Sequence, residues 1–344
     1  MEKKRSAGKI IGIVLLCICI LILLLMLAAF IYFNSLLGKI DRTEITGDLN
    51  LSEDQIYETP TVDVPDSIDE IEQVKQEFED AQAINIAQNS GVENILLIGT
   101  DYHNKGENGR SDTMILLSLN YNTGKIHMTS LMRAMYVCIP RSDGNVWGML
   151  NAAYSWGGPN LLIDTIELNF RVAIDKYVVV DFSAFEKAVD MLGGIELTIS
   201  EAEAHEITIH TPVKTSAGTQ ILNGAQTRGY CQIRATDNDF IRTSRQRQVI
   251  DLLIKKAEKM DIATLLDMAN ELLPLVNTNL NNSEIWLYIT KAFPMLKNVT
   301  TGRMLPVENE AGKSYTGIIY VNGREMYRVN FAHNIKELHD YINS

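Results

Sequence analysis

Three segments of the chain are apolar almost without interruption, and each has the length of one strand. They are VENILLIG (92–99), TMILLSLN (113–120) and DKYVVVDF (175–182). A strand with one face in water would alternate apolar and polar residues, whereas continuous runs are typical of strands covered on both faces. The chain therefore has to bury a sheet between layers of helices.

Helical segments alternate with these runs. NLLIDTIELNF (160–170) and TSRQRQVIDLLIKKAEKM (243–260) have helical spacing, and SAFEKAVDMLGG (183–194) carries a Ser183 N-cap and a Gly-Gly stop. RGYCQIR (228–234) is expected to be a further strand. Strands alternating with helices predict an α/β layered domain with a central mixed β-sheet flanked by helices.

The N-terminal segment predicts a membrane anchor. Residues 10–33 contain no charged residue, follow the basic stretch MEKKRSAGK (1–9), and are long enough to cross a bilayer with some tilt. A cleavable signal peptide has a shorter apolar region. Because the basic residues precede the span, the N-terminus is expected in the cytoplasm and the remainder outside it. This predicts a signal-anchored, single-pass protein of the cell membrane.

The remaining domain boundaries follow from charge. Residues 40–90 hold fourteen acidic and two basic residues, which equals the whole net charge of −12. We therefore expect a cytoplasmic tail (1–9), a transmembrane helix (10–33), an acidic extracytoplasmic stalk with a helix within 66–88 (34–90), and a catalytic domain (91–344).

The same charge distribution argues against nucleic-acid binding. No basic surface is evident, although nucleic-acid binding requires clustered positive charge. A cytoplasmic tail of nine residues is also too short for any DNA-reading module. A membrane-bound transcription regulator is therefore rejected.

The cysteines leave two readings open. Cys17 and Cys19 lie in the predicted span, while Cys138 and Cys231 lie in apolar, strand-like runs. An extracytoplasmic location permits a disulfide between the last two, but buried free thiols fit the same pattern. No spacing of Cys or His indicates a zinc site.

Polar clusters interrupt the apolar framework at predicted strand and helix ends. One contains Asp101, Arg110 and Asp112, a second is Arg133, and a third lies in IRATDNDFIRTSRQRQ (233–248). Paired carboxylates suit Mg²⁺ and arginine forks suit phosphate, which together are the equipment of phosphoryl transfer. The alternative for each residue alone is a surface ion pair of little energetic value.

In its motifs the chain resembles the LytR-CpsA-Psr family of bacterial cell-envelope enzymes. The resemblance rests on the order and spacing of NILLIGTD, GRSDTMILLSLN, LNAAYSWGGPNLLIDTIE, VDFSAFEKAVDMLGGIEL, LNGAQTRGYCQIR and DFIRTSRQRQ, and it covers about residues 92–260. It implies transfer of a glycopolymer, such as teichoic acid or capsule, from a polyprenyl-pyrophosphate carrier to peptidoglycan. It also implies Mg²⁺ as cofactor, a hydrophobic pocket for the polyprenyl chain, release of polyprenyl phosphate, and possible pyrophosphatase activity.

The resemblance also assigns roles to individual residues. Those matching catalytic positions are Asp101, Asp112, Arg133 and Arg242, of which Asp101 and Asp112 match the metal-associated acids. Those matching pyrophosphate-binding positions are Arg110, Arg133, Gln232, Arg234, Asp239, Arg242 and Gln246.

The chain departs from the family pattern at several of these positions. Met132 and Ala134 flank Arg133 where Pro and Asp are usual, Ile241 replaces a Gly, and Gln232 replaces the first Arg of an Arg-x-Arg pair. A missing guanidinium would weaken a pyrophosphate clamp unless its charge-assisted bonds are replaced. The alternative function is therefore a non-catalytic binder of polyprenyl-linked glycan or of the cell wall.

Overall fold

The structure is a computed structural model of the 344-residue chain. It describes residues 23–48, 50–52, 56–57, 61–87, 90–101, 109–233, 239–308 and 316–344. Its contacts divide the chain into two compact units, residues 1–40 and 41–344.

In the first unit, residues 23–37 form a helix whose apolar side chains between residues 23 and 32 are largely exposed. Among the described residues, no helix is both long enough and apolar enough to cross a membrane. The predicted span begins at residue 10, so its first half and the tail 1–9 lie outside the described residues. The anchor therefore stays a prediction.

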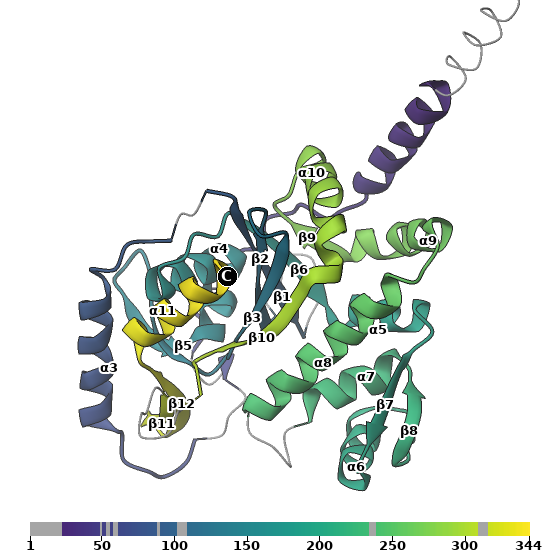
Figure 1. Cartoon of the computed structure of the whole chain (residues 1–344). Coiled ribbons are helices and arrows are strands. Elements are labelled where there is room, and N and C mark those ends of the chain that lie inside the picture. The colour runs from purple at the N-terminus through teal and green to yellow at the C-terminus, as the bar shows by residue number, and fades with distance from the viewer. Residues whose placement is uncertain are drawn as a thin grey trace, which may run out of the picture. The chain divides into compact units, whose positions relative to one another are not determined.

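The second unit is built on a six-stranded sheet with the order β10-β3-β2-β1-β6-β9 (Figure 1). These strands are β1 (Val92–Thr100), β2 (Ser111–Asn120), β3 (Lys125–Leu131), β6 (Lys176–Asp181), β9 (Val276–Thr278) and β10 (Val299–Leu305). β1 pairs with β2, β2 with β3, and β6 with β9 in antiparallel fashion, whereas β1–β6 and β3–β10 are parallel. The predicted central mixed sheet is confirmed.

Three two-stranded ribbons and a set of helices complete the unit. The ribbons are β4 (Tyr136–Ile139) with β5 (Val146–Met149), β7 (Ile195–Ile199) with β8 (Gly218–Leu222), and β11 (Thr316–Val321) with β12 (Arg324–Val329). The helices are α3 (Ile68–Ala81), α4 (Leu150–Phe170), α5 (Phe182–Met191), α6 (Glu201–His210), α7 (Gly224–Gln232), α8 (Asp239–Ala257), α9 (Ile262–Leu272), η1 (Leu273–Leu275), α10 (Asn282–Ala292), η2 (Phe293–Asn298) and α11 (Phe331–Ile342).

Helices cover both faces of the sheet, which explains the continuous apolar runs. On one face, Leu96 and Leu116 share a buried core with Phe170 of α4 and Phe331 of α11. On the other face, Ile95 and its neighbours pack against η2 and α10. The apolar side chains of β1 and β2 therefore meet apolar cover on both faces of the sheet, and alternation of apolar and polar residues is not needed.

The helix α3 lies inside the predicted stalk segment. Its apolar side is buried, and Phe78 makes edge-on ring contacts with Trp147 and Phe331 at centroid distances of 5.3 and 5.5 Å. Burying an aromatic ring of this size contributes a sizeable apolar area. This helix therefore packs into the core of the second unit.

The prediction of a strand at RGYCQIR (228–234) is wrong. Residues 224–232 form α7, which Asn223 and Gln226 begin with a reciprocal capping box. Such a box satisfies two backbone donors of the first turn and fixes the helix start. The helix α5 likewise starts two residues earlier than a Ser183 N-cap predicts, because Asp181 accepts the capping hydrogen bond from Ala184.

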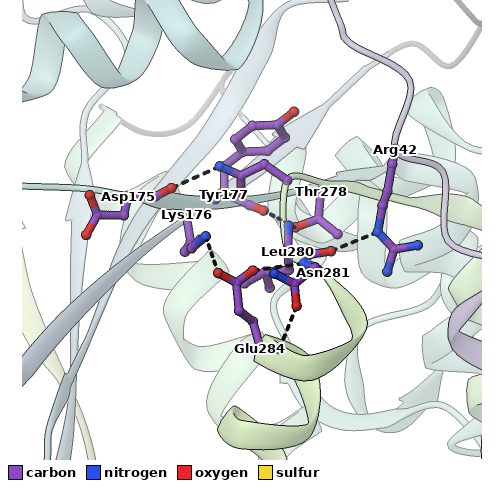
Figure 2. Close-up of polar contacts among 9 residues, drawn as sticks. Arg42, Asp175, Lys176, Tyr177, Thr278, Leu280, Asn281 and Glu284 are labelled. Carbon is purple, nitrogen blue, oxygen red and sulfur yellow. Dashed lines mark hydrogen bonds and ion pairs between the residues drawn. The ribbon is translucent and has the colours of Figure 1, made fainter. Parts of the chain in front are cut away.

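Polar contacts hold the edge strand β9 and the start of α10 against β6 (Figure 2). Lys176 forms an ion pair with Glu284 at 2.6 Å, and Thr278 donates to the carbonyl oxygen of Tyr177. Arg42 donates from Nε to the carbonyl oxygen of Leu280 at 2.8 Å. The contacts of Lys176 and Tyr177 lie at the beginning of β6, the strand whose far end, at Asp181, reaches the candidate site.

Candidate functional site

Two of the predicted acidic residues, Asp101 and Asp112, lie at one edge of the sheet together with Asp181, which was not predicted as a site residue. Asp101 follows β1, Asp181 ends β6, and Thr100 and Asp181 are paired in the parallel β1–β6 ladder. Asp112, the second residue of β2, lies at a register shift opposite Gly99 and Thr100, which pair with Thr113 and Ser111. In open α/β sheets, ligands bind outside the carboxyl ends of parallel strands, and this edge is such a place.

Arg110 and Asp101 are joined across this edge. The guanidinium of Arg110 donates to Oδ2 of Asp101 from Nε at 3.0 Å and from Nη2 at 2.7 Å, and its backbone N–H donates to Oδ1 at 2.7 Å. The bonds join the residue after β1 to the residue before β2 and hold the carboxylate in one orientation. Two residues predicted from one loop are thus in direct contact.

A second acid–arginine pair lies deeper. Nη1 of Arg133, which follows β3, donates to Oδ1 of Asp112 at 2.8 Å. The whole Arg133 residue is only 6% exposed, so its charge is held almost out of water. A charge in this position has to be compensated by a partner, which Asp112 supplies.

An open cavity of about 160 Å³ begins beside this pair. Its apolar walls include Phe182 and Phe185 of the α5 region together with Ile250 and Leu253 of α8. Its polar lining residues are Asp112, Asp181, Arg228, Gln232, Arg242 and Gln246. The cavity thus combines apolar walls with charged and polar lining residues, as a site for an amphipathic ligand requires.

Arg242 and Gln246 reach this cavity from the first turns of α8, one helical turn apart. Arg242 is nearly buried. Arg234 lies outside the described residues, and nothing is described of the Asp239 side chain, so these two predictions stay untested. Gln232 does line the cavity, but from α7 and not from a strand.

Arg245, which belongs to the same sequence cluster, has a different role. It donates to Oε1 of Glu203 from Nε at 3.2 Å and from Nη2 at 3.1 Å, and it lies over the ring of Tyr230. Burial raises the pKa of Glu203, but hydrogen bonds from Ser200 and Arg245 outweigh this and leave the pKa below its ordinary value. Arg245 therefore ties α8 to α6 beside the cavity.

Arg228 was not among the site residues predicted from the sequence. This residue lines the cavity, forms an ion pair with Glu186 of α5, and donates from Nη1 to Oε1 of Gln232 at 2.9 Å. Arg228 and Gln232 are four residues apart, so a helix brings them to one face whereas a strand would not give this contact. The capping box at Asn223 was the signal that could have revealed the helix.

Residues 60–336 match the LytR_cpsA_psr (LytR-CpsA-Psr) family. This match covers well over half of the chain. The chain belongs to the LytR-CpsA-Psr family.

Curated relatives agree with this assignment. The chain is 34% identical over 251 residues to the polyisoprenyl-teichoic acid–peptidoglycan teichoic acid transferase TagU of Oceanobacillus iheyensis. The aligned region covers 69% of this chain and 73% of TagU. It is 31% identical to the corresponding transferase TagV of Bacillus subtilis and 32% identical to the regulatory protein MsrR of Staphylococcus aureus. The chain spans only 50% and 60% of these two relatives, and the matches cover 55% and 58% of this chain.

Solved structures of the family have the same fold. The structure of TagT bound to LIIa-WTA superposes with a TM-score of 0.57 at 22% identity, over 76% of this chain and 93% of that one. The crystal structure of B. subtilis TagV gives a TM-score of 0.55 at 24% identity, over 74% of this chain and 99% of that one. At these identities the likeness concerns the fold alone.

Two of the departures from the LytR-CpsA-Psr pattern lie in the core. Met132 and Ala134 are 1% and 5% exposed, and neither lines the cavity. The backbone oxygen of Ala134 accepts a hydrogen bond from Tyr327 of β12 at 2.8 Å. An aspartate at position 134 would therefore have to be accommodated in an apolar setting.

The two remaining cysteines are both free thiols. Cys138 lies in β4, while Cys231 lies on α7 at the cavity wall. Burial raises the pKa of the Cys231 thiol to about 12. The reading of two free thiols is the one that the structure supports.

The side chains that could ligate a metal limit how Mg²⁺ would be held. Across the described ranges there is no group of three or more His, Cys, Asp or Glu side chains arranged to hold a metal ion. Mg²⁺ often takes only one or two carboxylates together with phosphate oxygens of a substrate. Asp101 and Asp112, each hydrogen-bonded to an arginine, are the two carboxylates that would hold such an ion together with a phosphate ligand.

Proposed function

We propose that this chain is a transferase that moves a glycopolymer from a polyprenyl-pyrophosphate carrier onto peptidoglycan and releases polyprenyl phosphate. The observation that carries the proposal is the apolar cavity lined by Arg242 and by Asp112, whose carboxylate accepts a hydrogen bond from the nearly buried Arg133. The relatives TagU and TagV, named as teichoic acid transferases to peptidoglycan, support the polymer and the acceptor.

The apolar and polar parts of the cavity would bind different parts of the ligand. The prenyl tail would lie between Phe182, Phe185 and Leu253, since burying apolar surface there removes it from water. The pyrophosphate would lie beside Asp112, where Arg242 lines the cavity and would donate to it. Arginine forks suit phosphate because they donate two parallel hydrogen bonds.

The chemistry is an in-line displacement at phosphorus. A hydroxyl of the acceptor attacks the phosphorus next to the sugar, a new P–O bond forms, and the bond to the bridging oxygen breaks. Polyprenyl phosphate leaves with the bridging oxygen, and the hydroxyl proton passes to a carboxylate, for which Asp101, Asp112 and Asp239 are the candidates. Bound Mg²⁺ would neutralise charge on the phosphate oxygens.

The location of the protein forms part of the same proposal. We propose a single-pass anchor within residues 10–33, a cytoplasmic N-terminus and an extracytoplasmic catalytic domain, which would place the cavity near lipid-linked substrates. The charge-free sequence of the segment, its basic flank and the acidic stretch that follows support this topology. Hydrolysis of the pyrophosphate by water would be a side reaction of the same site.

The second candidate function is a non-catalytic binder of polyprenyl-linked glycan. Gln232 favours it, because an amide stands at the cavity where a guanidinium would be expected. A binder would take up the lipid without cleaving it.

Turnover separates the two candidates. The full chain in detergent, with Mg²⁺, a lipid-linked glycopolymer and peptidoglycan fragments, is expected to release polyprenyl phosphate and to transfer the glycan. The variant Asp112→Ala and excess chelator should each stop the release. Lipid binding without release would favour the binder, and absence of both would contradict the proposed ligand class.

A further inference from the structure

Arg228 lies where two cavities meet. The apolar cavity described above adjoins a more open polar cavity of about 470 Å³, lined by Asp101, Asp181, Phe182, Ser183, Glu186 and Arg228. Asp181, Phe182 and Arg228 line both. Of these three shared residues only Arg228 carries a positive charge.

The side chain of Arg228 is held in place but keeps donors available. Its Nε contacts Glu186, its Nη1 donates to Gln232 at 2.9 Å, and its guanidinium lies 5.8 Å from the ring centre of Phe182. Within the part of the chain that the structure describes, these bonds use two of the five N–H groups of a guanidinium. The side chain is 24% exposed, so a ligand can reach it.

A ligand with a lipid tail and a sugar would span this junction. With its tail in the apolar cavity and its sugar in the polar one, its pyrophosphate would lie between them. We infer that Arg228 binds the pyrophosphate of the lipid-linked substrate and supplies, from one helical turn earlier, the guanidinium that is missing at Gln232. The inference rests on the proposed function, because that function defines the ligand.

The local geometry supports this replacement. Arg228 and Gln232 are in direct contact on one face of α7, so a guanidinium at either position serves the same side of the cavity. Glu186 fixes the orientation of Arg228, since a charge-assisted bond limits its rotation. The contact with Gln232 then adds a second hydrogen bond, to a neutral acceptor.

Binding of two probes to the full chain in detergent with Mg²⁺ tests the inference. Geranylgeranyl pyrophosphate carries tail and head group, and geranylgeraniol carries the tail alone. The variants are Arg228→Gln, Gln232→Arg and the swap of both. Arg141→Gln is the matched control, since Arg141 also pairs with an acid, Asp143, and lies 5.5 Å from the ring centre of Trp156, but lines neither cavity.

The expected pattern is selective for the head group. Arg228→Gln should weaken pyrophosphate binding about 20-fold and leave geranylgeraniol binding within about twofold, because only charge-assisted bonds are lost. The swap variant should recover most of the loss, and the Arg141 variant should bind both probes as the unchanged protein does.

Three outcomes would contradict the inference. Unchanged pyrophosphate binding by Arg228→Gln would overturn it, as would an equal loss of both probes, which indicates a structural role. A swap variant as weak as Arg228→Gln would show that position 232 cannot replace 228. If the unchanged protein binds no pyrophosphate at all, the proposed function fails as well, and this result is distinct from the other three.

Discussion

Nη1 of Arg133 and Oδ1 of Asp112 lie 2.8 Å apart, in side chains that are only 7% and 13% exposed. The pair joins the residue after β3 to the beginning of β2 at the rim of the apolar cavity. Asp112 also lines that cavity, so the same residue neutralises a nearly buried cation and borders the proposed ligand site. Stability and activity should therefore depend on the same residue.

Replacing Asp112 with Ala is expected to affect both properties. The free energy of unfolding should fall by about 3 kcal/mol, because Arg133 loses its acidic partner in a nearly buried place. Transfer activity should fall by about two orders of magnitude or more, on the scale of losing one electrostatic group of an active site. Chemical denaturation and a transfer assay measure the two effects.

The matched control is Asp143→Ala. Asp143 also pairs with an arginine, Arg141, but its side chain is 67% exposed, so its loss should cost less than about 1 kcal/mol. Equal stability of the two variants would argue against a buried pair at Asp112.

Gly224 is a sensitive point for the position of α7. A Cβ atom at this residue would lie 2.3 Å from the backbone oxygen of Glu186, so Gly224→Ala should push α7 away from α5. We expect a loss of about 1–3 kcal/mol in stability, together with weaker pyrophosphate binding through displaced Arg228. Thermal unfolding and ligand binding report the two effects.

Gly302→Ala is the control for this substitution, because no heavy atom lies within 4 Å of the Cβ position there. It should leave both properties nearly unchanged. If both glycine variants behave alike, the tight contact between α5 and α7 is not present in solution.

Filling the apolar cavity should weaken binding of the prenyl tail without affecting binding of the pyrophosphate head group. Leu253→Trp adds bulk to the cavity wall and should weaken geranylgeraniol binding by about tenfold, since apolar surface can no longer be buried there. Inorganic pyrophosphate should bind as before. Leu287→Trp, on an exposed position of α10, provides the control, and equal effects of both substitutions would exclude this cavity as the site of the tail.

The Glu203–Arg245 pair predicts a pH-dependent contribution to stability. Because the pKa of Glu203 lies below its ordinary value of 4.5 in the folded protein, the ionised group stabilises the fold above that pH. The contribution is lost as the pH falls through the lowered pKa. The free-energy difference between the unchanged protein and Glu203→Gln should thus be full at pH 7 and shrink below about pH 4.5.

Glu201→Gln serves as the comparison, since Glu201 is exposed in the first turn of the same helix, α6. It should cost little at any pH. A difference for Glu203→Gln that grows towards low pH would have the wrong sign and contradict the role of Arg245.

The sheet could be predicted because its strands are buried on both faces. β1, β2 and β6 are continuous apolar runs, and this pattern needs no tertiary information to be recognised. The helix α7 could not be read in the same way. The local sequence favours a strand, because it contains Tyr230, Cys231 and Ile233. The cap at Asn223 and the packing against α5 and α8 nevertheless determine a helix.

The same reason limited the prediction of the site. Asp101, Arg110, Asp112 and Arg133 were found because charged residues beside buried strands need partners, and the structure joins them in two pairs. Arg228 became visible only once residues 224–232 were seen as a helix, which brings it to Gln232. Asp181 was predicted only as part of a strand. It is the last residue of β6, and it also caps α5.

The fate of the two phosphorus atoms tests the central claim most directly. In a ³¹P NMR time course, the full chain would be mixed with Mg²⁺, a prenyl-pyrophosphate-linked oligosaccharide and a peptidoglycan fragment. The account predicts that the diphosphate signals are replaced in equal amounts by one monoester, prenyl phosphate, and one phosphodiester between sugar and acceptor. Persistent diphosphate signals of a bound ligand, or two monoesters without a phosphodiester, would contradict it.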